Sequence, residues 1–324
     1  MDVSHDSPLF SYEAHGLCFS SDFSLKRLRP QSTYEKSSTV EVTLHRGEKL
    51  ETSEVEAKTC IECCSDFICI RSRFGSVEIG QDTVKLFPSQ GTTHQSLFEY
   101  YAVYIAAFLL HDRDYLTIHA SAVEIDGGTI AFVGPKGVGK STTASLFYEQ
   151  GHRLLSDDLI ACRPSSTDAS PHVDPGFPWM KLGERSLSEV LERSGDKLEW
   201  TVPGSSKRIV PIHERQPDSP LPLRHVYVLG YHEESSDQQE VKIRQVGTKQ
   251  ACLVLLSNAF VQMFLEETGA DPEHLDRCAA LARRIPMSVL SRPQSMDALP
   301  SVYHTILDDI RATRPSDSSE DRPQ

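Results

Sequence analysis

The stretch that decides the fold is Gly134-Pro135-Lys136-Gly137-Val138-Gly139-Lys140-Ser141. It fits the pattern G-x-x-x-x-G-K-[ST] of a phosphate-binding loop, whose glycines let successive backbone N–H groups point at phosphate oxygens. In this pattern Lys140 adds a cation near the β and γ phosphates, and Ser141 offers a hydroxyl to Mg²⁺. Helix geometry places Thr142 near the α phosphate, so residues 134–142 form the predicted nucleotide-binding set.

The segments on either side supply the context that this motif needs. Thr129–Val133 is a short apolar run bounded by glycines and is typical of a buried strand. Ser141–Gln150 contains no helix breaker before Gly151, which predicts a helix with a glycine stop. The order of strand, glycine loop and helix favours a nucleotide-binding loop over a chance glycine turn.

Two adjacent acids, Asp157 and Asp158, follow a second short strand at Arg153–Ser156. Parallel strands joined by a helix end at the same edge of a sheet, so these acids should lie near the loop. One acid can hold Mg²⁺ while the other accepts the proton of an attacking hydroxyl. A solvated acidic turn is the alternative. About seventeen residues separate Lys140 from Asp157, the span of one crossover helix, and this favours the functional interpretation.

Three blocks together resemble a known family. His119–Val123, the glycine loop and Gly151–Asp158 are similar, in order and spacing, to the C-terminal catalytic domain of HPr kinase/phosphorylase. That family has a nucleotide core similar to that of phosphoenolpyruvate carboxykinase, with its acidic pair directly after the helix that follows the loop. The similar part covers roughly Leu116 to Cys162, well under half of the chain.

The resemblance implies phosphorylation of a protein serine with ATP and Mg²⁺. It makes Asp157 the expected base and places Asp158 and Ser141 at the metal. His119 is expected near the phosphates, whereas a histidine after an apolar strand, taken alone, is more often a core residue. Lys140 is expected to offset charge on the transferred group.

The chain departs from that family further on. The family's second signature, a glycine-rich stretch with arginine that serves the phosphorolytic reaction, is not found. Pro175–Leu182 stands there and is similar to HPr-kinase-like proteins of peptide-modification gene clusters, including kinases of lasso-peptide precursors. Tyr12–Leu17 and Ser20–Asp22 resemble the start of the same subgroup. These segments favour a peptide kinase over a bifunctional regulator of sugar uptake and leave phosphorylase activity open.

Composition is that of a cytoplasmic enzyme. The chain has 324 residues, which is long enough for two domains, and 39% of them are hydrophobic, which supports ordinary hydrophobic cores. It has no apolar run of membrane-spanning length, and its N-terminus lacks the basic and apolar regions of a signal peptide. The net charge of -13 disfavours nonspecific nucleic-acid binding. We therefore expect neither a membrane nor a nucleic acid as partner.

Four of the eight cysteines cluster, namely Cys60, Cys63, Cys64 and Cys69. The spacing of Cys60 and Cys63 suits a zinc ligand pair, but no second pair follows at the expected distance. The apolar residues between them indicate strands, in which cysteine acts as a small hydrophobe. Reduced thiols are therefore the simpler interpretation.

The chain divides near residue 115. Residues 1–115 contain short alternating runs, which predict a smaller, mainly antiparallel β domain: Val40–Leu44, Cys69–Ser72 and Val77–Ile79. A helix at Gln95–His111 leads out of this domain. Substrate docking and a purely architectural role remain equally compatible with it.

Residues 116–312 are expected to form an α/β P-loop kinase domain of the HPr kinase/PEP carboxykinase type. The predicted elements are a core strand at Val226–Leu229, a helix from Asp271-Pro272 to about Arg284, a final strand at Pro286–Leu290 and a helix at Met296–Arg311, with Pro300 either in its first turn or interrupting it. The tail 313–324 is expected to be disordered.

Two further positions allow two interpretations each. Arg208, in the pair Lys207-Arg208, could reach over a transferring phosphoryl group or lie in an exposed turn. Trp179 could line a peptide cleft or be a buried aromatic.

The sequence thus supports an ATP- and Mg²⁺-dependent kinase acting on a serine hydroxyl of a peptide or small protein, with a lasso-type precursor peptide as the best candidate. The alternatives are a kinase of a small hydroxylated metabolite such as free serine, and a nucleotide-gated binding module. The choice of ATP over GTP, the identity of the acceptor and a homo-oligomeric state stay open.

Overall fold

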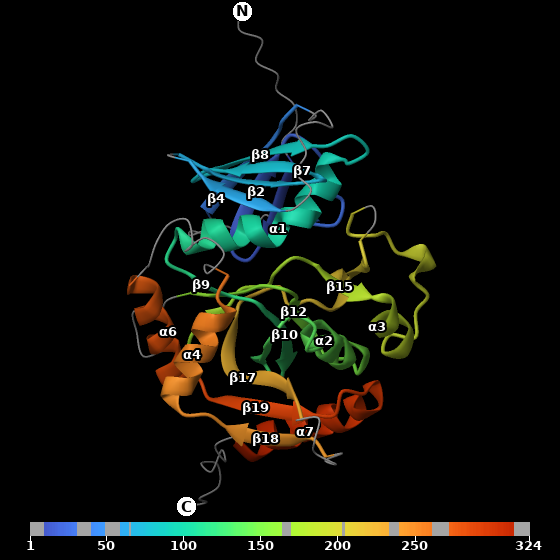
Figure 1. Cartoon of the computed structure of the whole chain (residues 1–324), viewed down its shortest axis with the longest axis vertical. Coiled ribbons are helices and arrows are strands. Elements are labelled where there is room, and N and C mark those ends of the chain that lie inside the picture. Colours follow the sequence, from blue (N-terminus) through green and yellow to red (C-terminus); the bar gives the residue numbers. More distant parts are fainter. Residues whose placement is uncertain are drawn as a thin grey trace, which may run out of the picture.

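The computed structural model describes residues 10–30, 40–48, 59–64, 66–163, 170–202, 205–232, 240–260 and 272–313. Two large sheets lie one above the other along the long axis, and helix α1 (His94–His111) crosses between them (Figure 1). Within these ranges, no helix combines the length and the apolar character needed to cross a membrane.

The first sheet has eight strands in the order β3-β1-β2-β4-β8-β7-β6-β5. Their bounds are β1 Phe10–Ala14, β2 Leu17–Ser21, β3 Arg29–Pro30, β4 Val40–Arg46, β5 Cys60–Cys63, β6 Ile68–Ser72, β7 Gly75–Ile79 and β8 Thr83–Pro88. Most neighbours are antiparallel, as predicted, but β4 runs parallel to both β2 and β8. Long stretches of chain separate β4 from each of these strands, and parallel pairing needs such crossovers.

Helix α1 begins one residue before the predicted start and covers the first sheet. The hydroxyl of its N-cap, Thr93, accepts a hydrogen bond from the backbone N–H of Ser96, which satisfies one of the free donors of the first turn. Its buried face includes Phe98, whose ring lies 5.9 Å from that of Phe19 in β2. The helix is thus part of the core of the first sheet.

The second sheet has nine strands, with β12-β10-β11-β17 in order and β17 pairing with both β14 and β19. Their bounds are β9 Leu116–Ile118, β10 Ala120–Ile125, β11 Gly128–Val133, β12 Leu154–Ser156, β13 Ile160–Cys162, β14 His172–Val173, β17 Leu221–Tyr231, β18 Lys242–Gln245 and β19 Met287–Arg292. Strands β11, β17 and β19 are parallel. Strand β12 runs in the direction of β11 but is separated from it by β10, which is antiparallel to both. The loop and the acids therefore follow strands that end at the same edge.

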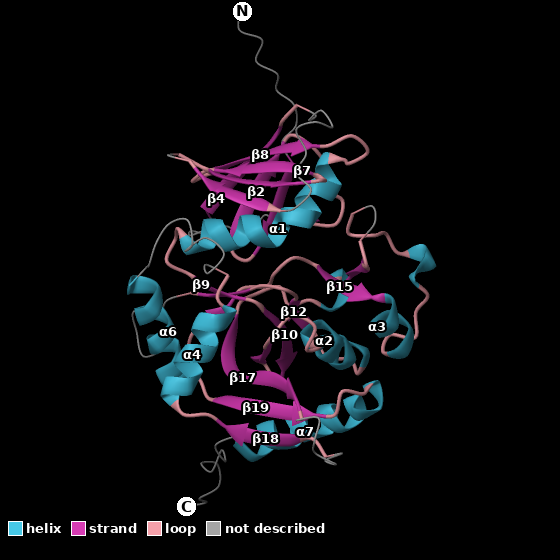
Figure 2. Ribbon diagram, in the orientation of Figure 1, coloured by secondary structure: helices cyan, strands magenta, loops and turns pink. Residues whose placement is uncertain are grey.

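Helices cover both faces of this sheet (Figure 2). They are α2 Lys140–Glu149, α4 Thr248–Asn258, α6 Pro272–Arg284 and α7 Leu299–Thr313, with a short α3 at Glu184–Glu189 and a hairpin of β15 Trp179–Gly183 and β16 Lys207–Pro211. Alternation along β11 decides the packing, because Phe132 joins the core under α2 and α7 while Ala131 and Val133 join the core under α4 and α6. Pro300 lies in the first turn of α7. The predicted cap at Asp271 and residues 314–324 of the tail lie outside the described residues.

Phe177 joins the two sheets. Its ring stacks on Trp179 at 4.9 Å and packs against Phe19 and Phe98 of the first core at 6.4 and 6.0 Å. Trp179 is 3% exposed, so its interpretation as a buried aromatic is confirmed. The hydrophobic core of the first sheet therefore continues into the second half of the chain.

We predict that Phe177→Ala lowers the free energy of unfolding by about 3–5 kcal/mol, because it leaves a cavity among aromatic rings. Urea denaturation followed by fluorescence measures this change. Leu253→Ala, at a side chain that is 65% exposed on α4, serves as the control and should stay within about 0.5 kcal/mol of the parent. Equal losses in both variants would contradict the role of Phe177.

Candidate functional site

The glycine loop has the geometry of an anion-binding site. Gly134, Gly137 and Gly139 all have positive φ, at 139°, 87° and 99°, a region that glycine enters without steric cost. Gly139 is the N-cap of α2, and no side chain caps this helix end. The backbone N–H groups and the positive end of the helix dipole are thus available to an anion. The loop residues Pro135 to Gly137 are exposed.

Lys140 is buried beneath this loop. Its ammonium group donates hydrogen bonds to the carbonyl oxygens of Gly134 at 2.8 Å and Pro135 at 3.3 Å. Burial lowers the pKa of Lys140, and the charges of Asp158 and Asp157 oppose that shift. The lysine therefore lies between the loop and the acids. Next in α2, Thr142 pairs its hydroxyl with that of Ser186 at 2.9 Å.

Asp157 is buried at the end of β12, and both of its carboxylate oxygens have donors. The hydroxyl of Ser121 donates to Oδ1 at 2.6 Å, and the backbone N–H of Lys181 donates to Oδ2 at 3.0 Å. Burial raises the pKa of Asp157, and the charge of Asp158 raises it further. A carboxyl group with a raised pKa is a better proton acceptor, as general-base catalysis requires. Asp158 has a left-handed backbone with φ 67° and is more exposed.

His119 lies beside Asp158, with 3.9 Å between its Nε2 and Oδ1 of the acid. Burial, and then the charge of Lys140, lower the pKa of His119 to about 4. The ring is therefore neutral at pH 7. The backbone N–H of His119 donates to the carbonyl of Asn258 at 2.7 Å, and the side-chain oxygen of Asn258 accepts from the backbone N–H of Gly134 at 3.1 Å. Asn258, which sequence analysis missed, thus links the histidine to the loop.

Of the basic pair on β16, Lys207 is the residue that influences the site. Its positive charge opposes the rise that burial causes in the pKa of Asp157, and it adds to the fall that burial causes in the pKa of His119. Arg208 is engaged elsewhere, because it donates to Glu184 at 2.9 Å and to the carbonyl of Leu198 at 2.9 Å. Its guanidinium also lies over the ring of Trp200, 3.2 Å from the centroid. Successive side chains of a strand point to opposite faces, which explains why these neighbours differ.

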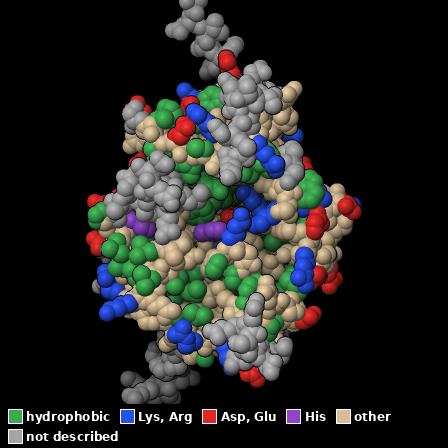
Figure 3. Space-filling view, in the orientation of Figure 1, with side chains coloured by type: hydrophobic (Ala, Val, Ile, Leu, Met, Phe, Trp, Pro, Cys, Tyr) green, Lys and Arg blue, Asp and Glu red, His purple; other side chains and the backbone are tan. Residues whose placement is uncertain are grey.

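Two further basic residues were missed by sequence analysis. Arg292, at the end of β19, is 3% exposed. Its guanidinium donates a hydrogen bond to the carbonyl of Val138 at 3.1 Å and so stabilises the loop. Lys181 on β15 is 8% exposed. Burial lowers the pKa of Lys181, and the charge of Asp158 is the strongest of those that raise it. Figure 3 shows Lys and Arg side chains gathered at a hollow in the middle of the molecule, with His and acidic side chains beside them.

The residues at this site fit Mg²⁺ only together with a phosphate ligand. Among the described residues, no group of three or more His, Cys, Asp and Glu could hold a metal ion by itself. Asp158 and Ser141 offer one carboxylate and one hydroxyl, which suits Mg²⁺ because this ion takes few protein ligands and keeps waters and phosphate oxygens. Of the clustered cysteines, Cys60 and Cys63 lie on β5 and Cys69 on β6, as predicted, whereas Cys64 follows β5. Only Cys69 is buried as a small hydrophobe would be; the other three are exposed.

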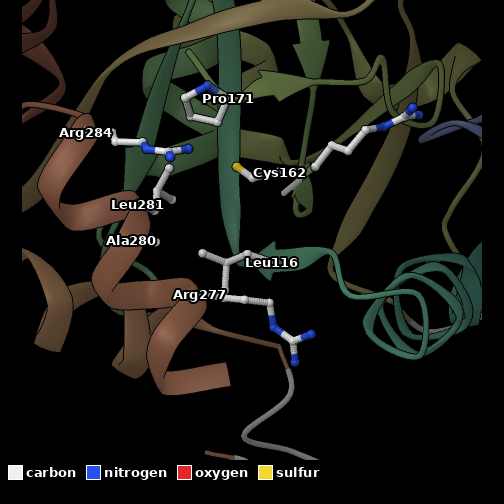
Figure 4. A pocket seen from close by; sticks show the side chains of 8 residues that line it. Leu116, Cys162, Pro171, Arg277, Ala280, Leu281 and Arg284 are labelled. Carbon is white, nitrogen blue, oxygen red and sulfur yellow. The ribbon is translucent and has the colours of Figure 1, made fainter. Parts of the chain in front are cut away.

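A separate cavity of about 110 Å³ lies between β9, β13 and α6 (Figure 4). It is lined mainly by Leu116, Cys162, Pro171, Leu281 and Arg284. Burial raises the pKa of the Cys162 thiol to about 12, so this thiol is unreactive at neutral pH. None of the predicted site residues lines this cavity.

No protein-family model matches the chain. Curated HPr kinase/phosphorylases are similar to parts of it. The protein of Lachnoclostridium phytofermentans is 30% identical over 109 residues, which are 34% of this chain and 33% of that protein. The protein of Caldanaerobacter subterraneus subsp. tengcongensis is 38% identical over 53 residues, 16% and 17% of the two chains. That of Treponema pallidum subsp. pallidum is 47% identical over 45 residues, 14% of each chain.

The chain thus aligns with no more than about a third of the length of these three relatives. A solved structure of the Hpr(Ser) kinase/phosphatase from Coxiella burnetii is 12% identical and covers 60% of this chain and 90% of that one, with a TM-score of 0.32. The sequence relatives confirm the partial similarity to HPr kinase/phosphorylases that the three sequence blocks predicted. The peptide-cluster subgroup stays a prediction.

The glycines of the loop give a testable difference. A Cβ at Gly137 would meet open space, so Gly137→Ala should cost only the strain of a left-handed backbone, about 1–2 kcal/mol. A Cβ at Gly139 would lie 2.6 Å from Nη2 of Arg292, which must then move. We therefore expect Gly139→Ala to be the more destabilising of the two in urea denaturation. Equal losses would contradict the close contact with Arg292.

Proposed function

We propose that this protein is an ATP- and Mg²⁺-dependent kinase that transfers the γ-phosphoryl group to a serine hydroxyl of a peptide or small protein. The observation that carries the proposal is the placement of Asp157 and Asp158 near Lys140, whose pKa is lowered by burial and raised by the charges of these acids, beside an uncapped, glycine-rich helix N-terminus. Its support from known proteins is the partial similarity to HPr kinase/phosphorylases.

In the proposed reaction the acceptor oxygen attacks the γ phosphorus. The bond from that phosphorus to the β–γ bridging oxygen breaks, ADP leaves, and the hydroxyl proton passes to Asp157. The raised pKa of Asp157 supports this assignment, because a more basic carboxylate accepts the proton more readily. The hydrogen bonds from Ser121 and Lys181 keep its carboxylate fixed, so that little reorganisation is needed.

The remaining roles follow from position and charge. Ser141 and Asp158 would hold Mg²⁺, which offsets charge on the β and γ phosphates when bound. The loop and the first turn of α2 would bind the triphosphate through backbone N–H groups from Lys136 onward, because Pro135 has no N–H and that of Gly134 donates to Asn258, with Lys136 and Lys140 adding charge. Neutral His119 would accept or donate one hydrogen bond near the phosphates. In place of Arg208, we propose Lys207 as the cation of β16 that offsets charge during transfer, because its charge acts on both Asp157 and His119.

The proposal is tested by incubating the protein with radiolabelled ATP, Mg²⁺, a mixture of serine-containing peptides and free serine, with the labelled product mapped by mass spectrometry. We expect label on peptide serine. Asp157→Asn should lower transfer by about 10²–10⁴-fold, the usual contribution of a general base, while ATP binding is retained. Lys140→Ala should weaken ATP binding as well. Unchanged turnover in Asp157→Asn would remove its role as base, and label on free serine alone would identify a metabolite kinase.

Asp158→Asn should act through the metal. We expect the Mg²⁺ concentration for half-maximal transfer to rise about ten-fold or more, corresponding to about 1.4 kcal/mol of lost binding. Transfer at saturating Mg²⁺ should recover in part, which distinguishes this variant from Asp157→Asn. Titration of Mg²⁺ at fixed ATP measures the effect, and an unchanged midpoint would assign Mg²⁺ to other groups.

A further inference from the structure

Helix α1 presents only aromatic side chains to solvent over most of its length. From Leu97 to Leu110 every residue is buried except Tyr100, Tyr104 and Phe108, which are partly exposed. Their spacing of four places them along one side of the helix. Phe74, in the turn between β6 and β7, extends the row, with its ring 4.9 Å from that of Tyr100. We call these four residues the aromatic stripe.

The aromatic stripe leads directly to the candidate site. The ring of Tyr104 lies 6.4 Å from that of Phe260, and Phe260 lies 5.3 Å from the ring of His119. His119 is in turn 3.9 Å from Asp158. Burial raises the pKa of Tyr104 most, and the charge of Asp158 adds to the rise, which agrees with this proximity. Within the described residues, the hydroxyl of Tyr104 has no hydrogen-bond partner.

The size of the aromatic stripe selects among the acceptors considered above. Tyr100 and Phe108 are eight residues apart, or about 12 Å along the helix at about 1.5 Å per residue. A free amino acid is too short to cover that length, whereas about four residues of extended chain span it at about 3.3 Å each. The stripe carries no charge, so it fits apolar side chains. The cations near the acids and His119, Lys140 and Lys207, suit phosphate instead.

Figure 3 agrees with this division. Hydrophobic side chains lie within the hollow at the level of α1, and Lys and Arg side chains lie at its edge. A partner that crosses the hollow would thus meet apolar surface on one side and positive charge on the other.

We infer that the aromatic stripe is the docking surface for the acceptor peptide, and that it selects a peptide with aromatic or aliphatic side chains within about five residues of the phosphorylated serine. The inference rests on the proposed kinase function and makes its substrate class specific. It gives the first sheet, through α1, a part in binding substrate.

A positional-scanning library of peptides with one fixed serine, incubated with radiolabelled ATP and Mg²⁺, tests this inference. Wild-type protein should label peptides with apolar residues near the serine most strongly. Tyr104→Ser should lower kcat/KM for the best peptide by about ten-fold or more, the loss expected when an apolar contact is removed. Tyr104→Phe keeps the ring and should retain the preference. Leu253→Ser, which alters an exposed hydrophobic side chain on α4, is the matched control and should change nothing.

Each other outcome has a definite meaning. Labelled peptides without apolar preference, or an unchanged kcat/KM in Tyr104→Ser, would overturn the docking surface and leave the kinase function intact. A weaker ATP affinity in Tyr104→Ser, measured by filter binding, would assign the stripe to the nucleotide base instead. Absence of any labelled peptide, although ATP binds, would overturn the proposed function and the inference together.

Discussion

The carboxylate of Asp157 is the constraint on which the rest of the site depends. A buried carboxylate is costly unless its oxygens receive hydrogen bonds. Here one donor comes from Ser121 on β10 and the other from the backbone of Lys181 on β15. Satisfying one acid therefore fixes the hairpin β15–β16 against the central sheet. The same hairpin carries Lys207. The buried Asp157 therefore also helps to position the cation whose charge opposes the rise that burial causes in its pKa.

The first sheet also helps to position Asp157, through the turn between β1 and β2. His15, at the tip of the β1–β2 hairpin, is fully buried, and its backbone N–H donates to the carbonyl of Pro175 at 2.7 Å. A side chain at Gly176 would collide with both the His15 ring and the hydroxyl of Ser156, the residue before Asp157. Burial lowers the pKa of His15 to about 3, so the ring stays neutral in this contact. These contacts support an architectural role for the hairpin, beside the docking role inferred for α1.

The sequence predicted the part of the site that is formed by residues close together along the chain. The strand, glycine loop, helix and acids lie within one short segment, and each has a local pattern. Asn258 and Arg292 hold the same loop from 124 and 154 residues away along the chain, and such contacts leave no local signal. The stretch around Lys181 was noticed only for its resemblance, because a single lysine in a strand does not reveal that its backbone meets a buried acid.

The charge of the site runs against that of the whole molecule. The chain carries a net charge of -13, yet the cations Lys136, Lys140, Lys181 and Lys207 act on the acids or on the histidine beside them. Positive charge concentrated at one site of an acidic protein produces a local field that attracts small polyanions to that site. Besides burial, the charges of Lys140, Lys207 and Lys136 lower the pKa of His119, so a phosphate bound in the loop would offset their charge and draw that pKa upward. The histidine and the glycine loop are therefore coupled through charge as well as through Asn258.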